Sequence, residues 1–303
     1  MMNLGKRITM TALLSLAALT LSACAGGDPL APDGDRVSET LIVGSQDYYS
    51  NVIIAEIYSQ ALEQAGFTVD RQFRIGQREV YLPEIEKGNI DLFPEYTGPL
   101  LQYWAKNPPE RLADDVYQAL VKVTPENLRV LKQSPATDQD SYVVSRAFAE
   151  KWGLKNIEDL AKVTVPMVMG ANSEGENRPN GPKGLQASYG VSVGFTPIED
   201  GGGPLTIKAL NDGDIQLAIM YTADPAMQKN DLVSLKDTKG LFLASHVVPL
   251  ASNKVNEKAA QIINTISTTM TEEMLLALNN RSVDEQLPAA TIAKDWLREQ
   301  KLN

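Results

Sequence analysis

Catalytic side chains are scarce in this sequence of 303 residues. It has one cysteine, Cys24, and one histidine, His246, which excludes Cys–His dyads, Cys/His metal cages and any disulfide within the chain. His246 lies in an apolar stretch with no nucleophile elbow nearby, so a Ser-His-Asp triad is not expected. The acids in segments that could reach a ligand are Asp47, Glu95 and Asp140, and none has an evident partner for proton transfer. The residue types therefore disfavour an enzyme, and we expect neither a metal nor a cofactor.

Tyrosines at matching points of an internal repeat are better candidates for a site. The segments 86–97 and 211–222 each carry Gly-x-Ile-x-Leu and each end in Tyr-Thr, at an offset of 125 residues. Ligands of open α/β sheets bind beyond the carboxyl ends of the strands, so Tyr96, Tyr221 and the adjacent Thr222 are expected in a cleft. The alternatives are a chance match and two half-buried tyrosines that only pack.

A second pair of matching segments indicates the fold class. The apolar, strand-like segments 41–45 and 167–171 are 126 residues apart, close to the offset of the tyrosines. A helical pattern over 52–62 ends at Gly66, and strand-like spacing over 67–75 follows it. Strand–helix–strand units of this length predict parallel sheets with helices on both faces. The sequence therefore predicts an α/β protein with two lobes of the same plan.

The C-terminal part of the chain has no partner in the repeat. Helical patterns cover three segments there, 257–269, 271–280 and 288–299. If this helical tail returns to cover the first lobe, lobe I consists of residues 40–135 plus 240–303, and lobe II is inserted as residues 136–239. Tyr142 begins a strand near the first predicted crossover, where it could add a third ring to the cleft.

The N-terminus resembles a bacterial lipoprotein signal. Lys6-Arg7 precedes an apolar run over 8–21 that is too short to span a bilayer comfortably. The run leads into Leu-Ser-Ala-Cys, which is similar to a lipobox, so residues 1–23 are predicted to be a signal peptide and Cys24 the lipidated first residue. Residues 24–39 then form a flexible tether on the outer side of the membrane. The alternative is an ordinary secretory signal with a chance cysteine.

Charge and composition restrict the partners. The chain has 28 basic and 38 acidic residues, and its basic residues are scattered, which argues against nucleic acid. Apolar residues make up 43% and charged residues 22%, typical of a globular protein and not of one with many membrane spans. Glu56, Glu84 and Glu86 are expected on helix surfaces, where they either meet a membrane permease or are simply solvated.

Four segments carry a resemblance to a known family. They are 44–47 (Gly-Ser-Gln-Asp), 55–58 (Ala-Glu-Ile-Tyr), 90–98 (Ile-Asp-Leu-Phe-Pro-Glu-Tyr-Thr-Gly) and 177–181 (Asn-Arg-Pro-Asn-Gly). They resemble the substrate-binding lipoproteins of ABC importers for quaternary amines, among them glycine betaine, choline and carnitine. The resemblance runs from about Leu41 to the C-terminus. It implies a two-lobed periplasmic-binding-protein fold of type II with two hinge crossovers, and a monomer that delivers its ligand to a permease.

The resemblance also implies which residues bind the ligand. The family encloses a trimethylammonium group in aromatic rings, and Tyr96, Tyr142 and Tyr221 fall at three of these aromatic positions. No well-placed acid is expected beside them. Arg178 stands where relatives hold a ligand carboxylate, the alternative being a surface ion pair with Glu174 or Glu176.

Departures from the family pattern leave the ligand open. Gln46, followed by Asp47 in the first loop, replaces a lysine that assists carboxylate binding in some members. Pro99 stands where a polar ligand contact is common, and Ser245 where a fourth aromatic ring is usual. Residues 201–203, all glycine, are expected to add flexibility that could widen the cleft. A larger ligand, either aromatic or polyol, and a sensor with no transport role are therefore the alternatives.

Overall fold

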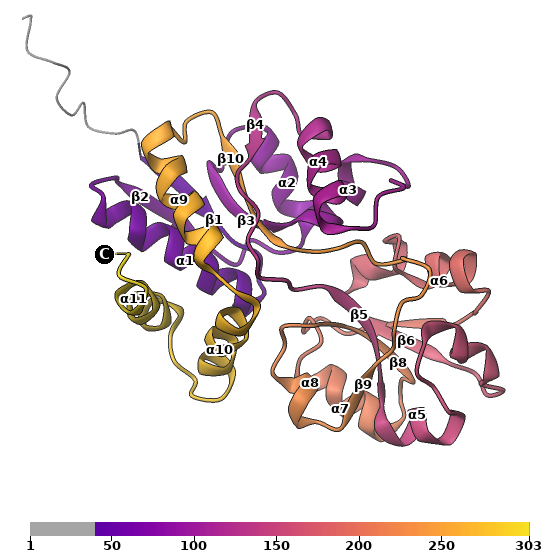
Figure 1. Cartoon of the computed structure of the whole chain (residues 1–303). Coiled ribbons are helices and arrows are strands. Elements are labelled where there is room, and N and C mark those ends of the chain that lie inside the picture. Colours follow the sequence, from indigo (N-terminus) through magenta and orange to yellow (C-terminus); the bar gives the residue numbers. More distant parts are fainter. Residues whose placement is uncertain (1–39, 303) are drawn as a thin grey trace, which may run out of the picture. The chain divides into compact units, whose positions relative to one another are not determined.

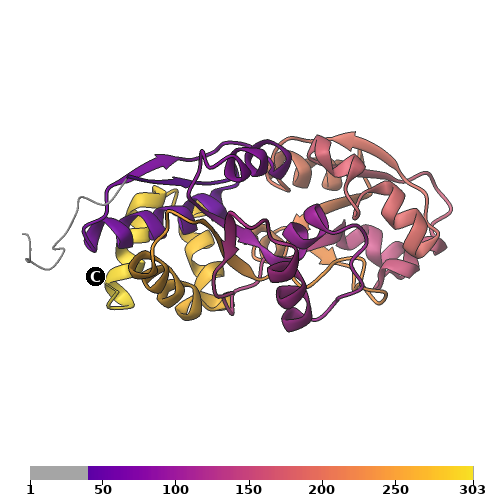
Figure 2. The same cartoon turned by 90° about the horizontal axis from the view of Figure 1, so that it is seen from above.

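Two five-stranded sheets organise residues 40–302, the part of the chain that the computed structural model describes (Figure 1). The first sheet has the order β2 (Val69–Gln72), β1 (Leu41–Gly44), β3 (Leu92–Tyr96), β10 (Val247–Ser252), β4 (Leu128–Val130). The second has the order β7 (Gly194–Pro197), β6 (Val168–Ala171), β8 (Leu217–Tyr221), β5 (Asp140–Ser145), β9 (Leu232–Ser234). We call each sheet with its helices lobe I and lobe II (Figure 2). Cys24, the predicted signal peptide and the tether lie outside the described residues.

The two sheets have the same strand plan, which confirms the repeat. In lobe I, β1 is parallel to β2 and β3, and β10 is antiparallel to β3 and β4. Strands β6, β7, β8, β5 and β9 repeat this arrangement in lobe II. The prediction of parallel sheets was wrong for one strand of each lobe. Strands β5 and β10 are the two that the chain enters from the other lobe, and each runs against its neighbours.

Helices cover both sheets. Lobe I has α1 (Tyr49–Gln64), α2 (Arg78–Glu86), α3 (Thr97–Trp104), α4 (Ala113–Val123), α9 (Glu257–Thr269), α10 (Glu272–Val283) and α11 (Ala289–Glu299). Lobe II has α5 (Arg146–Trp152), α6 (Pro182–Tyr189), α7 (Pro204–Asp212), α8 (Ala226–Lys229) and two short 3₁₀ helices, η1 (Ile157–Lys162) and η2 (Ser173–Asn177). Gly88 and Gly213 follow α2 and α7 with φ of 80° and 81°, so both end their helices in the left-handed region, as predicted.

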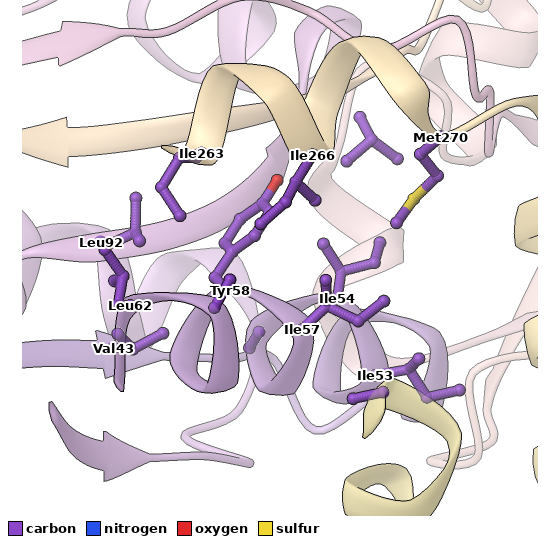
Figure 3. Close-up of a cluster of buried hydrophobic side chains, with 14 of the residues drawn as sticks. Val43, Ile53, Ile54, Ile57, Tyr58, Leu62, Leu92, Ile263, Ile266 and Met270 are labelled. Carbon is purple, nitrogen blue, oxygen red and sulfur yellow. The ribbon is translucent and has the colours of Figure 1, made fainter. Parts of the chain in front are cut away.

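The predicted helical tail packs on lobe I. Helix α1 is apolar on most of its surface because it lies between the first sheet and the tail helices α9–α11. Figure 3 shows Ile54 and Tyr58 of α1 facing Ile266 and Met270 of the segment that contains α9. This core fixes the start of α1, and the loop of Gln46 and Tyr48 that leads into α1 belongs to the candidate site.

Two segments connect the lobes, and they are hydrogen-bonded to each other. One runs from β4 to β5 and the other from β9 to β10. The backbone N–H of Asp138 donates to the carbonyl of Ser245 at 3.1 Å, and the Ser245 hydroxyl donates to the carbonyl of Asp138 at 3.1 Å. His246 extends this junction, because its Nδ1 lies 2.7 Å from the carbonyl oxygen of Ser134. The single histidine therefore has a packing role at the crossovers.

The glycine that ends β1 is required by the close approach of a ring. A Cβ atom at Gly44 would lie 2.8 Å from Cδ2 of Phe93, and Phe93 stacks on Tyr81 with ring centroids 4.1 Å apart. At Gly194, on edge strand β7, the corresponding distance to Val168 is an ordinary 3.6 Å. The two positions differ in the space that their neighbours leave, and Gly44 is buried while Gly194 is exposed.

We therefore expect Gly44→Ala to destabilise the protein by about 1–3 kcal/mol, since overpacking displaces the ring of Phe93. Gly194→Ala, the matched control, should change the free energy of unfolding by about 0.5 kcal/mol or less. Urea unfolding of both variants measures the difference. Equal stability of Gly44→Ala and the wild type would contradict the packing argument.

Candidate ligand-binding site

A small cavity lies between the lobes and is lined by both. Its lining residues are Gln46, Tyr48, Gln77, Arg78, Tyr96, Pro99, Asp138, Asp140, Arg178 and Tyr221. The cavity volume is about 20 Å³, and one water molecule needs about 10–15 Å³. A quaternary amine therefore enters only if the lobes part or the lining side chains move.

Three tyrosine rings line the cavity, two of which the sequence predicts. Tyr96 ends β3 and Tyr221 ends the equivalent strand β8, so each lobe contributes one ring. The third ring, Tyr48, comes from the residue before α1 and was not predicted. The rings of Tyr48 and Tyr221 meet across the lobes, with centroids 4.7 Å apart and planes tilted by 41°.

The loop that carries Gln46 and Tyr48 is held by one asparagine. Asn51, in the first turn of α1, accepts the backbone N–H of Gln46 at 3.0 Å and donates to the carbonyl of Pro94 at 2.8 Å. The loop is thereby tied to strand β3, which carries Tyr96. Two adjacent tyrosines, Tyr48 and Tyr49, directly before an apolar helix were the sequence signal for this ring.

A buried ion pair places an arginine at the cavity. Arg78, the first residue of α2, donates from Nε and Nη2 to the two carboxylate oxygens of Glu95 at 2.9 and 3.0 Å. Glu95 is fully buried and also accepts the hydroxyl of Tyr81 and the backbone N–H of Tyr96. Glu95, for which the sequence showed no partner, thus accepts hydrogen bonds at both carboxylate oxygens. Its partner Arg78 lines the cavity.

The second arginine of the cavity pairs across the lobes. Arg178, which follows η2 in lobe II, donates to Glu79 of lobe I at 2.9 and 3.1 Å, and to Gln77 at 3.2 Å. The sequence offered Glu174 or Glu176 as the alternative partners, and the structure has Glu79 instead. Its role as a carboxylate ligand stays a prediction.

Two aspartates line the cavity, contrary to the expectation that no acid is well placed there. Asp138 and Asp140 both lie at the entry to β5. Burial, with the nearby carboxylates of Asp140 and Asp224, raises the pKa of Asp138 to about 8, while the backbone N–H of Ala223 opposes the shift. Burial also raises the pKa of Asp140, against the lowering effect of Arg178 and Arg78. Acids on a crossover segment have no periodicity to reveal them, so the sequence did not predict Asp138.

Four polar atoms of the lining are buried with no hydrogen-bond partner among residues 40–302. They are Nε2 of Gln46, the hydroxyls of Tyr48 and Tyr96, and Oδ2 of Asp138. Burial raises the pKa of both tyrosines well above the usual value, so they remain neutral hydroxyl groups. Buried polar groups of this kind are normally paired, which marks the cavity as a place for a polar ligand.

Several predicted site residues lie outside this cavity. Tyr142 is fully buried in the core of lobe II, where its hydroxyl donates to the carbonyl of Asn180 at 2.7 Å. Asp47 and Thr222 are exposed and bond to neighbouring protein groups. Ser245, at the predicted position of a fourth ring, joins the crossovers, whereas Gln46, Pro99 and Arg178 line the cavity. Whether Tyr142, Asp47 and Thr222 contact a ligand stays a prediction.

Two surface features also differ from expectation or remain untested. Glu56 is buried and paired with Arg71 at 2.9 Å, so it is not the solvated helix acid that was predicted. Residues 201–203 form the turn into α7, in which Gly201 and Gly202 have φ of 63° and 88°. This turn passes beside Tyr221, and its effect on the width of the cleft stays a prediction.

A second cavity of about 220 Å³ adjoins the first. The two share Arg78, Pro99, Asp140 and Arg178 as walls. Beyond them the second cavity is lined by Glu79, Gln102, Tyr103, Asn177, Pro179 and Asn180. Arg78 and Arg178 are therefore common to an inner space with three tyrosines and an outer space with one tyrosine and three amides.

Two lobes joined by two crossovers, with a cavity lined from both sides, define a two-lobed solute-binding protein. The sequence agrees, because residues 39–299 match the family described as the substrate-binding domain of the ABC-type glycine betaine transport system. The chain belongs to this family. The fold class and the class of function predicted from the sequence are thereby confirmed.

Similar proteins differ in the ligand that they are named for. The chain is 25% identical over 274 residues to the ergothioneine transport permease/ergothioneine binding protein EgtU of Helicobacter pylori, covering 88% of this chain but only 49% of that protein. It is 26% identical to the glycine-betaine-binding protein of Pseudomonas aeruginosa, with 92% and 93% of the two chains covered. A crystal structure of a glycine betaine/carnitine/choline ABC transporter is similar in fold, with a TM-score of 0.68, 19% identity and 86% and 99% coverage.

The raised pKa of Asp138 predicts how stability depends on pH. An aspartate with a pKa near 4 when unfolded and about 8 when folded binds its proton more tightly in the native state. Its contribution to stability is full below pH 4 and is lost as the pH rises toward 8, by about 1.4 kcal/mol per pH unit. Asp138→Asn removes this loss, so the variant should gain on the order of 3–4 kcal/mol over the wild type between pH 5 and pH 8.

Thermal or urea unfolding of both proteins without ligand, at pH 5 and pH 8, measures this gain. Asp214→Asn makes the same change at an exposed site and serves as the control. A difference between wild type and Asp138→Asn that is the same at both pH values would contradict the prediction.

Proposed function

We propose that this chain is the receptor of an ABC importer that closes around a small quaternary ammonium compound of the choline or betaine type. It delivers the ligand to a permease in the membrane and catalyses no reaction. The observation that carries the proposal is the inner cavity, in which Tyr48, Tyr96 and Tyr221 come together from both lobes beside buried acids. The family to which the chain belongs, and the relatives named for glycine betaine, carnitine and choline, support it.

The chemistry of the lining suits a methylated cation. A quaternary nitrogen has no N–H to donate, so its charge is best met by the faces of aromatic rings and by a nearby anion. Asp140, and Asp138 once it loses its proton, supply that anion, while Glu95 and Glu79 already pair with the two arginines. Because each arginine is balanced by a glutamate, any ionised aspartate leaves the site with a net negative charge, which favours a cationic ligand.

A larger ligand is the second candidate, and the outer cavity favours it. A compound with a methylated head in the inner space could place a second polar part beyond Arg78 and Arg178, against the amides of Gln102 and Asn177. The relative named for ergothioneine makes that compound a useful member of any ligand panel.

We further propose that the protein is monomeric and is held outside the cell membrane by a lipid on Cys24. The lipobox-like segment and the tether behind it motivate this proposal. None of the helices within residues 40–302 is long and apolar enough to cross a membrane.

Binding should depend on the positive charge of the ligand. Choline and 3,3-dimethylbutan-1-ol have nearly the same shape, but carbon replaces the quaternary nitrogen in the second compound. If ring faces and acids hold the head group, the neutral compound should bind about 30- to 1,000-fold more weakly. Titration calorimetry of both compounds measures the ratio, and equal affinities would refute the quaternary-amine proposal.

Two variants at one position test the ring itself. Tyr221→Ala should weaken choline binding by about 1–3 kcal/mol, because a desolvated ring face and its packing are both lost. Tyr221→Phe keeps the ring face and should bind within a few-fold of the wild type. An unchanged affinity of Tyr221→Ala would remove lobe II from the head-group site.

Lipidation should require Cys24. In cells grown with a labelled fatty-acid analogue, the wild type should carry the label and stay with the membrane fraction. Cys24→Ala should lose both properties while keeping ligand affinity. A labelled, membrane-bound Cys24→Ala would refute the lipid anchor.

A further inference from the structure

Two large apolar side chains are exposed at equivalent positions of the two lobes. Val80 on α2 is 52% exposed, and Leu205 on α7 is 64% exposed. They are 125 residues apart, the same offset that relates the Tyr-Thr pairs at the ends of β3 and β8. Single exposed apolar residues are common on soluble proteins. Among the large apolar side chains exposed within residues 40–302, however, no other two are related by this offset.

The two helices that carry these side chains match each other position by position. Val80 is followed by the fully buried Tyr81, and Leu205 is followed by the fully buried Thr206. Both helices then end at the left-handed glycines already described, each eight residues after the exposed side chain. The same helix geometry therefore turns Val80 and Leu205 outward, so their exposure is a shared property of the repeat.

Both helices begin beside the inner cavity. Arg78, two residues before Val80, lines it. Gly201, four residues before Leu205, lies so close to the lining that an added Cβ would be 3.8 Å from the ring of Tyr221. One exposed apolar side chain of each lobe therefore lies near the place where a ligand enters.

The distance between these side chains depends on how far the lobes are closed, because each lobe carries one of them. The lobes touch in this structure, where the rings of Tyr48 and Tyr221 meet and Arg178 pairs with Glu79. A rigid partner that binds both side chains fits them at only one degree of closure. Such a partner stabilises the closed receptor over the open one.

We propose that Val80 and Leu205 form a two-point apolar docking surface for the membrane permease. The inference rests on the proposed function, and it names the surface of this chain that the permease contacts. Because the two positions have like surroundings, the permease is expected to offer two like apolar pockets, as a dimer or an internally repeated protein does.

A lipid surface fits the two side chains less well than a protein does. Membrane binding by a protein surface depends on the apolar area that it buries and on attraction to anionic lipids. Val80 and Leu205 are separate side chains on different lobes, and the carboxylates of Glu79 and Glu84 on α2 are partly exposed near Val80. The surface therefore has little apolar area in one place and the wrong charge for anionic lipid.

The test measures binding of the purified, lipid-free chain to membrane vesicles from the cells that naturally express it. Val80→Asp and Leu205→Asp each place a charge where a pocket would bury an apolar group, so each should weaken vesicle binding by about tenfold or more. An acid in the first turn of a helix is favourable, so both variants should fold. Choline affinity, measured by calorimetry, should stay within about twofold of the wild type.

Matched controls make the same change elsewhere in each lobe. Leu112→Asp in lobe I and Val165→Asp in lobe II replace side chains that are 72% and 44% exposed but have no equivalent in the other lobe. Both should bind the vesicles within about twofold of the wild type. Vesicles treated with protease, and vesicles made of the extracted lipids alone, should not bind the wild type.

Each outcome decides the inference. A wild type that does not bind the vesicles, two variants that bind like the wild type, or a loss in only one of them overturns it. Equal binding to lipid vesicles would assign the two side chains to a lipid surface. A wild-type dimer in sedimentation that Val80→Asp dissociates would assign them to a second copy of the chain. If the wild type binds no choline but both variants lose vesicle binding, the proposed ligand fails and the docking surface stands.

Discussion

The two chain segments between the lobes are hydrogen-bonded to each other, and the site depends on this constraint. Asp138 on one crossover and Ser245 on the other exchange two hydrogen bonds, so the segments form one junction and not two independent links. Asp138 also lines the cavity. A residue of the cavity lining is therefore part of the junction between the lobes. The cavity and the crossovers therefore share Asp138, and the geometry of one constrains the geometry of the other.

Much of the fold could be predicted because the local spacing of apolar residues and glycines indicates its helices and strands. The apolar segment around β1, the glycines after α2 and α7 and the helical tail all have the spacing of their elements, and the repeat offset identified the equivalent strands β3 and β8. The direction of β5 and β10 could not be read in this way. The two antiparallel strands are those that the chain reaches directly after crossing from the other lobe. A short apolar strand has the same sequence pattern in either direction, so this difference is not visible in the sequence.

The site was only partly predictable, for a related reason. Tyr96 and Tyr221 end strands of the repeat, so their position followed from the fold, and both line the cavity. Tyr142 lies on a strand too, but its ring packs in the core of lobe II, since a strand position does not tell how deep a side chain is buried. Tyr48, Arg78 and Asp138 precede or begin elements. Loop ends have no periodicity, and the pairing of Arg78 with Glu95 becomes visible only when α2 packs beside β3.

The saturated carboxylate of Glu95 has a consequence for anyone who would redesign this receptor as a sensor. Its two oxygens serve four donors, from Arg78, Tyr81 and the backbone of Tyr96, so Arg78 can be replaced only together with its partner. Breaking one side of a buried ion pair usually costs about 3–5 kcal/mol. Gln46, Tyr48 and Asp138 each keep an atom with no bond inside residues 40–302. Arg78 and Glu95 are thus fixed by each other, whereas Gln46, Tyr48 and Asp138 can be exchanged more freely. A library of variants aimed at a new analyte should vary these three positions.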